Sequence, residues 1–145
     1  MGKSLIVAGA LALAAVLTGA AGPAIAPHAA ALARALDAHT TALQRERYAL
    51  AAGPLRGEVR AAAPASVSVR LWANQDYVLA AACAEACGEL RLRVRDPAGA
   101  VIAEVSGASP RIRVRPGVTG RHAIESAAPH CRAAPCHYAL NVYAR

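Results

Sequence analysis

Short runs in which apolar residues alternate with polar ones fill the second half of the chain, and they constrain its fold more than any other feature. Together with two short apolar runs they occupy residues 66–71, 77–82, 90–95, 101–105, 111–115, 121–126 and 138–143, with turn residues such as Asp96-Pro97 and Pro116-Gly117 between them. An antiparallel sheet over one core needs this alternation, because one face is buried and the other is in water. About seven strands at this spacing predict a mainly β protein, an antiparallel β-sandwich over residues 66–145.

The preceding segment has a different period. Residues 28–52 contain neither proline nor glycine and are rich in alanine and leucine, which are strong helix formers. Leu32, Leu36, Leu43 and Leu50 make one thin apolar stripe, and Gly53-Pro54 is a stop signal. We therefore predict one N-terminal α-helix over residues 28–52 and a linker over residues 53–65.

The first residues have the three-part layout of a secretory signal peptide. Lys3 supplies the positive start, residues 5–17 are uncharged and apolar, and small residues follow. We place the signal peptide at residues 1–24; cleavage after Ala20, Ala21, Ala24 or Ala26 fits the small-residue rule, although Pro27 disfavours the last. Ala20 stands where a lipoprotein needs cysteine, so no lipid anchor is expected. An uncleaved membrane anchor is the alternative, but the apolar run is shorter than the about 20 residues that span a bilayer. The predicted location is secreted or periplasmic, with no membrane span after cleavage.

Three motifs within the predicted sandwich carry a family resemblance. They are residues 74–79 (Asn-Gln-Asp-Tyr-Val-Leu), residues 89–99, which end in Asp96-Pro97-Ala98-Gly99, and residues 116–122 (Pro-Gly-Val-Thr-Gly-Arg-His). Residues 66–145 thereby resemble the bacterial pre-peptidase C-terminal (PPC) domain family. The resemblance implies a jelly-roll-like sandwich that accompanies secreted enzymes without being catalytic. Family members often carry acidic residues that can hold calcium; here Cys87-Gly88-Glu89 and the arginines of residues 91–95 take their place, so no cofactor is expected.

The four cysteines, in a chain predicted to be exported, indicate disulfides. Cys83, Cys87, Cys131 and Cys136 are an even set, which predicts two bonds. Three connectivities exist, and we favour the local pairs Cys83–Cys87 and Cys131–Cys136 over the crossed ones. Zinc binding with His130 and His137 is an alternative, but the Cys spacings fit zinc knuckles loosely and an oxidising compartment removes thiolates. A redox pair would need Cys-x-x-Cys, which neither pair has. We expect no metal site.

Arginine dominates the charge. The formal net charge is +7, and Lys3 is the lone lysine. Two strand segments each carry three arginines on one face: Arg91, Arg93 and Arg95, and then Arg111, Arg113 and Arg115. If both faces point the same way they form a polyanion site, because guanidinium groups suit phosphate and carboxylate; the alternative is a solvated face. Specific nucleic-acid binding is not expected, since stacking aromatics are scarce.

No sequence motif for catalysis is present. The chain lacks a nucleophile elbow, a zinc-protease helix motif, a phosphate loop and a dinucleotide fingerprint, and a triad of His122 and Glu125 with a serine would be a chance grouping. We therefore predict a non-catalytic structural or protein-interaction module, with another exported protein as partner and the leucine stripe as its candidate contact. The alternative is a protein that binds a polyanion or an anionic surface through the arginine rows, and a small hydrolase is the third possibility.

Overall fold

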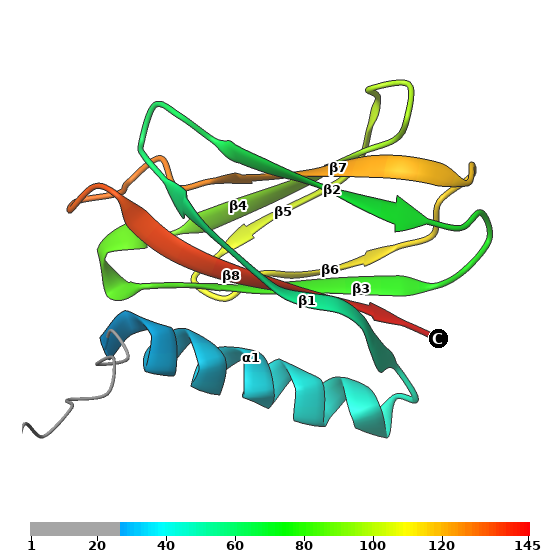
Figure 1. Ribbon diagram of the computed structural model, residues 1–145, viewed down its shortest axis with the longest axis horizontal. Helices are drawn as coiled ribbons and strands as arrows, with labels where there is room; N and C mark the ends of the chain where they lie inside the picture. The colour runs from blue at the N-terminus through cyan, green and yellow to red at the C-terminus, as the bar shows by residue number, and fades with distance from the viewer. Residues whose placement is uncertain (1–26) are drawn as a thin grey trace, which may run out of the picture.

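The computed structural model describes residues 27–145, so the predicted signal peptide and its cleavage positions lie outside the described residues. Two four-stranded antiparallel sheets face each other and one helix covers the outer side of the first (Figure 1). The elements in chain order are α1 (Pro27–Arg45), β1 (Ala49–Val59), β2 (Ala65–Leu71), β3 (Tyr77–Cys83), the one-turn 3₁₀ helix η1 (Glu85–Cys87), β4 (Leu90–Arg95), β5 (Val101–Gly107), β6 (Arg111–Val114), β7 (Gly120–Ala127) and β8 (Cys136–Ala144). Within this range no helix is both long and apolar enough to cross a bilayer.

The strand order is that of a jelly roll. One sheet runs β1-β8-β3-β6 and the other β2-β7-β4-β5. The first strand pairs with the last, the second with the seventh, the third with the sixth, and β4 with β5. The chain is therefore a long antiparallel hairpin rolled into two layers, as eight-stranded jelly rolls are. The predicted mainly β sandwich with an N-terminal helix is confirmed, with one strand more than the seven expected.

The core lies between the sheets and follows the alternation of the sequence. In β4, Leu90, Leu92 and Val94 are buried while the arginines between them face outward. The inward positions of β3, β7 and β8 complete the cluster with leucine, valine, isoleucine and tyrosine. Phenylalanine is absent from the chain, so tyrosine supplies the aromatic volume of the core. Burial raises the pKa of Tyr138, and the neighbouring Ser126 hydroxyl lowers it by a smaller amount.

Helix α1 packs its leucine stripe on the outer side of the β1-β8-β3-β6 sheet. Leu32 and Leu36 contact Ala82 and Ala139, which lie on neighbouring strands of that sheet. Further along the helix, Leu43 is fully buried in a second cluster of larger side chains, with Tyr48, Val78, Ala80 and Tyr143. The predicted stripe is thus part of the protein's own core, except for Leu50, which lies in β1 and is exposed.

A polar contact fixes the helix within this apolar interface. The Thr40 hydroxyl donates to the Leu36 carbonyl at 3.0 Å and lies 2.7 Å from the Tyr143 hydroxyl. The Tyr143 hydroxyl also accepts the Asn141 side-chain N–H at 3.0 Å. Hydrogen bonds are directional, so this network sets the rotation of the helix more narrowly than leucine packing alone does.

The helix ends before the predicted boundary of residue 52, because the chain forms a Schellman turn. The Tyr48 N–H donates to the Leu43 carbonyl and the Arg47 N–H to the Gln44 carbonyl, both at 3.0 Å. Arg47 has the left-handed φ of 66° that this motif requires after a helix. Glycine usually fills that position, and the arginine here carries no sequence signal of a stop. Tyr48 then packs on Leu43, which is the apolar contact that accompanies the motif.

The predicted linker over residues 53–65 is wrong for most of its length, since β1 extends to Val59. Gly53-Pro54 lies inside the strand, where the pairing with β8 shifts register between Ala52 and Leu55. Proline is tolerated there because β1 is an edge strand with an irregular ladder. Gly53 has φ of 124°, and a Cβ at this position would lie 2.9 Å from the Leu140 carbonyl oxygen, so glycine is needed at the bulge.

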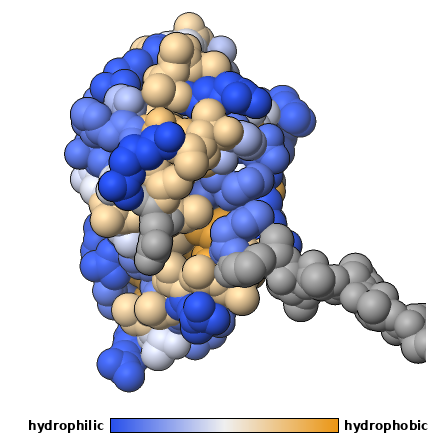
Figure 2. All heavy atoms as spheres, turned by 90° about the vertical axis from the view of Figure 1, so that its left-hand side faces the viewer, coloured by the Kyte–Doolittle hydropathy of each residue, from blue (hydrophilic) through white to orange (hydrophobic). Residues whose placement is uncertain are grey.

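The sandwich has two ends, which we name by their contents. The disulfide end holds the connections at residues 60–64, 84–89, 108–110 and 128–135, together with the start of α1. The tryptophan end holds residues 46–48, 72–76, 96–100 and 115–119 and the last residues of β8. Figure 2 looks at the disulfide end, where tan, weakly hydrophobic residues lie among blue, hydrophilic ones. The large apolar side chains that are exposed within residues 27–145 all lie at or beside the tryptophan end: Leu50, Trp72, Val101, Ile102 and Val118.

Candidate functional site

The two predicted arginine rows lie on opposite outer faces of the sandwich. Arg91, Arg93 and Arg95 point outward from β4, in the β2-β7-β4-β5 sheet, because the residues between them are buried. Arg111 and Arg113 point outward from β6 in the other sheet, beside α1, and Arg115 is exposed just after that strand. The six guanidinium groups therefore do not line one side. The alternation within each strand correctly predicts that each row points outward. Which sheet a strand belongs to depends on long-range pairing, which the alternation does not reveal.

Carboxylates from other segments compensate the row on β6. Glu46, just after α1, forms ion pairs with both Arg111, at 3.7 Å, and Arg113. Asp76 lies 3.7 Å from Arg115 and also pairs with Arg145. These groups are substantially exposed, so each pair contributes under about 1 kcal/mol to stability. The same carboxylates cancel part of the positive charge of this row, which makes the row a weaker site for an anion.

The row on β4 is compensated in part. Arg93 donates to Glu104 on β5 at 2.7 Å, and Arg95 donates to Glu125 on β7 at the same distance. The hydrogen bond that Arg93 donates to Glu104 raises the pKa of Arg93 and lowers the pKa of the Glu104 carboxyl. Among the described residues, no carboxylate forms an ion pair with Arg91. The arginine at the start of the row is thus the one open to a ligand.

Two further arginines share this face, and sequence reasoning missed them. Arg70 on β2 is directly opposite Arg121 on β7 in the strand register. The Arg121 Nε donates to the Ser68 hydroxyl at 3.2 Å, and the Arg70 guanidinium lies over the Trp72 ring, 5.6 Å from its centroid. No carboxylate in residues 27–145 forms an ion pair with either one. Like charges opposite each other destabilise a sheet, so this pair opposes folding rather than supporting it.

The outer side of the β2-β7-β4-β5 sheet is therefore strongly basic, and we call it the arginine face. It carries five arginines against two glutamates: Arg70, Arg91, Arg93, Arg95 and Arg121, with Glu104 and Glu125. Arginine presents planar, fixed donors that match the oxygens of phosphate, sulfate and carboxylate. The arrangement is therefore chemically suited to bind an anion.

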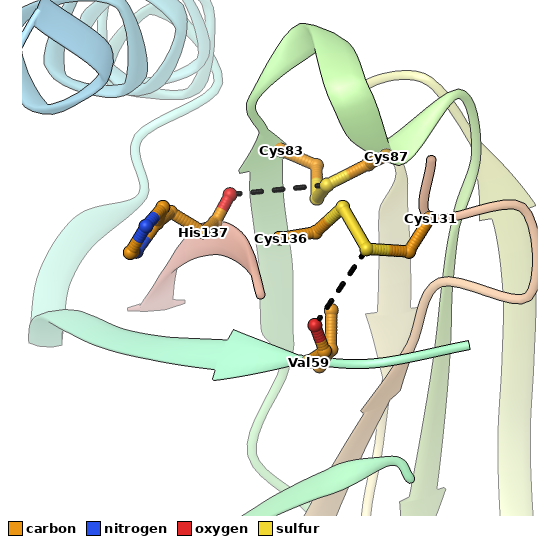
Figure 3. The surroundings of a disulfide bond; sticks show 6 residues. All are labelled: Val59, Cys83, Cys87, Cys131, Cys136 and His137. Atoms are coloured by element: carbon orange, nitrogen blue, oxygen red, sulfur yellow. Dashed lines mark hydrogen bonds between the residues drawn. A yellow bond between two sulfur atoms is a disulfide. The ribbon is translucent and has the colours of Figure 1, made fainter. Parts of the chain in front are cut away.

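Both disulfides lie at the disulfide end, in the predicted local pairs. Cys83–Cys87 and Cys131–Cys136 each join Cα atoms 6.0 Å apart, and Figure 3 shows them next to each other. The Cys131 Sγ lies 3.8 Å from the Val59 carbonyl oxygen; a disulfide sulfur has no hydrogen, so this is a packing contact. The Arg132 N–H donates to the Ala86 carbonyl at 2.9 Å and joins the two loops. With all four thiols consumed, the described residues contain no group of three potential metal ligands.

Two disulfides indicate an oxidising, non-cytoplasmic environment. Cytosolic thiol pools keep most cysteines reduced, and both pairs here close short loops at one end of the sandwich. The structure thus supports an oxidising compartment, as the cysteine count indicates. Secretion through a signal peptide stays a prediction.

The structure separates the histidine and the carboxylate that the sequence offered for a triad. His122 is buried between the sheets whereas Glu125 is on the arginine face, so the two point away from each other. A different pair, without any signal in the sequence, is His39 Nε2 on α1, which lies 2.7 Å from the Ser109 hydroxyl. The Ser109 hydroxyl also donates to the Ala81 carbonyl at 3.2 Å, so the two contacts link α1 to β3. Burial, and then the charge of Arg111, lower the pKa of His39.

Two hollows in the described surface lack the properties of a small-molecule site. A gap of about 230 Å³ between α1 and β1, lined by residues such as Leu36, Leu50 and Asn141, is smaller than most such sites, which begin at about 300 Å³. A larger depression of about 650 Å³ at the disulfide end is open and is lined by residues 88–89 and 129–132. Large apolar side chains, which usually line a ligand site, are missing from the lining of this depression.

Comparison with models of known families and with curated proteins finds no match to this sequence. The resemblance to the PPC family therefore stays a prediction. Its motif residues form turns at the tryptophan end: Asp96 Oδ1 accepts the N–H groups of Ala98 and Ala100, and the Ala73 N–H donates to the Thr119 hydroxyl at 2.9 Å. Such turns occur in many β proteins, so they account for the connections between strands and do not point to a ligand.

Proposed function

We propose that this protein is an exported, non-catalytic binding module whose arginine face binds an anionic polymer. The observation that carries the proposal is the register pairing of Arg70 with Arg121, two like charges held opposite each other without a carboxylate partner among residues 27–145. An anionic polymer would relieve that repulsion and could extend along β7 toward Arg91, which lies at the other end of the face, opposite Ala127. Export rests on the signal peptide predicted at residues 1–24, and the secreted or periplasmic location rests on it too.

The other predicted role, a structural or protein-interaction module, has less support. Its candidate contact was the leucine stripe, and Leu32, Leu36 and Leu43 are packed on the sheet. A partner protein would have to use a different surface. The charge of the arginine face points to acidic groups as the complementary chemistry, and polyphosphate, sulfated polysaccharide and polyglutamate share that chemistry.

Retention on immobilised heparin in rising salt tests the proposal, with polyphosphate and polyglutamate as competitors to separate the three anion types. Arg70→Glu with Arg121→Glu should shift elution to much lower salt, because each lost guanidinium contact removes roughly one released counterion. The fold should tolerate this change, since one opposed like-charge pair replaces another.

The matched control is Arg34→Glu with Arg45→Glu on the exposed side of α1, which alters the net charge by the same amount. We expect it to reduce retention only slightly. Equal losses in the two variants would mean that net charge alone drives binding, and the assignment of the arginine face would then be wrong. Unchanged retention in both would favour the protein-interaction role instead.

A further inference from the structure

The exposed apolar side chains of the tryptophan end lie outside the core clusters of the described residues. Trp72 is 51 % exposed and Val118 is 50 % exposed. Large apolar groups gathered on one end of a monomer usually mark a contact with a partner or a membrane. The disulfide end of the same sandwich has no such group among residues 27–145, so the asymmetry belongs to the tryptophan end alone.

The loops that carry these side chains are held in place by the fold. The Trp72 N–H donates to the Tyr77 hydroxyl at 3.0 Å, and the next N–H, of Ala73, donates to Thr119. The Asn74 N–H donates to the Pro116 carbonyl at 2.9 Å, which joins the loop of Trp72 to the loop of Val118. The two apolar groups are therefore held together by ordered backbone, which lowers the conformational entropy that is lost when they bind a partner or a membrane.

Two arginines without an ion-pair partner among the described residues lie directly behind this apolar tip. Leu71 opposite Gly120 is the last pair of the β2–β7 ladder, and Arg70 opposite Arg121 is the pair before it. Asp76 and Asp96 also lie at this end, but Asp76 is engaged by Arg115 and Arg145, and the Asp96 Oδ1 accepts two backbone N–H groups of its own turn. An apolar tip with a tryptophan, followed by a band of positive charge, matches a bilayer surface, where tryptophan sits among headgroups and arginine meets lipid phosphate.

We infer that the tryptophan end docks on an anionic lipid bilayer, with Trp72 and Val118 in the interface and Arg70 and Arg121 at the headgroup phosphates. The inference rests on the proposed function, because the same arginines supply the attraction, and it adds lipid headgroups as a further anionic ligand of these arginines. Peripheral binding of this kind grows with the apolar area inserted and with the charge attracted. Neither part is expected to hold the protein alone.

Trp72 is the sole tryptophan of the chain, so its fluorescence reports on this contact directly. Vesicles of phosphatidylglycerol mixed with phosphatidylcholine should shift its emission to the blue, and vesicles of pure phosphatidylcholine should not. Val118→Ser keeps the reporter and should weaken vesicle binding about tenfold, from the lost apolar area. Arg70→Glu with Arg121→Glu should weaken it by roughly thirtyfold. Arg34→Glu with Arg45→Glu is the control of equal charge.

Several outcomes would overturn the inference. Heparin retention without any blue shift on anionic vesicles would leave the proposed function standing and remove the membrane. Sedimentation with vesicles while Trp72 emission stays unchanged would place the contact on another surface. A blue shift that grows with protein concentration in the absence of vesicles would assign the tip to a second copy of the chain. If the unmodified protein bound neither heparin nor anionic vesicles, the inference and the proposed function would both be refuted.

Discussion

The disulfide end and the tryptophan end close the same two sheets with different chemistry. At the first, covalent bonds and backbone hydrogen bonds such as that between Arg132 and Ala86 join neighbouring loops. At the second, hydrogen bonds hold the loops: the Asn74 N–H donates to the Pro116 carbonyl, and the Tyr77 and Thr119 hydroxyls and the Asp96 carboxylate accept other backbone N–H groups. The first end exposes small residues and the second exposes large apolar ones. If the proposed function is right, the disulfide end secures the fold while the tryptophan end is available for binding.

Removal of both disulfides should give the largest effect and tests whether the disulfide end secures the fold. Replacing Cys83, Cys87, Cys131 and Cys136 with alanine should lower the free energy of unfolding by about 4 kcal/mol, roughly 2 kcal/mol for each short loop. Urea unfolding measures the loss. Hydrogen exchange should rise at the disulfide end, and the emission of Trp72 in the native protein should stay the same. Equal loosening of both ends would show that the two ends are not secured separately.

The two halves of α1 offer a test of intermediate size. Leu43 is surrounded by Tyr48, Val78 and Tyr143, whose packing would leave a cavity if the leucine were truncated. Leu32 faces small alanines instead. Leu43→Ala should cost about 3 kcal/mol of unfolding free energy and Leu32→Ala about 2 kcal/mol, because the cost grows with the cavity left behind. Thermal and urea unfolding of the two variants provide a matched pair. A larger loss from Leu32→Ala would show that the helix is anchored mainly near the disulfides.

The smallest expected effect concerns pH and His39, which joins α1 to the β5–β6 loop at the disulfide end. Its pKa is lowered from the ordinary 6.5 by burial and then by Arg111, so the folded protein binds this proton less readily than the unfolded chain. This contribution to stability is present above the ordinary value and is lost as pH falls through the lowered one. Unfolding at about pH 7 and about pH 5 should therefore differ less in His39→Gln than in the unmodified protein. An identical pH dependence in both would show that His39 does not contribute.

Local patterns in the sequence predicted most of the fold. Alternation in residues such as Leu90 to Arg95 identified the strands and their buried faces, and the cysteine spacing favoured the pairs that the structure has. The boundary between α1 and β1 was not predictable, because Arg47 takes the left-handed conformation that normally needs glycine. Ala49 and Ala52 have helical propensity, yet pairing with β8 places them in a strand.

The arginine face was only half visible in the sequence. Arg91, Arg93 and Arg95 were predicted to share a face because they alternate with apolar residues along one strand. Arg70 and Arg121 are far apart in sequence, and nothing local indicates that the strand register sets them opposite each other. The separation of the β4 and β6 rows onto different sheets was hidden for the same reason. Long-range strand pairing decides both the facing of Arg70 and Arg121 and the separation of the two rows. This pairing cannot be deduced from the sequence of one chain alone.

Tyrosine as the aromatic residue of the core has a consequence for how freely this protein can change. Tyr77 and Tyr143 each fill apolar volume and also hold a hydrogen bond to a neighbouring segment, to the loop of Gln75 and to Thr40 of α1. Packing and hydrogen bonding between segments are therefore carried by the same side chains. A substitution that repacks the core also alters the contacts between its layers, so we expect evolutionary drift at these positions to proceed by paired changes, with Tyr143 and Thr40 as the first pair to change together.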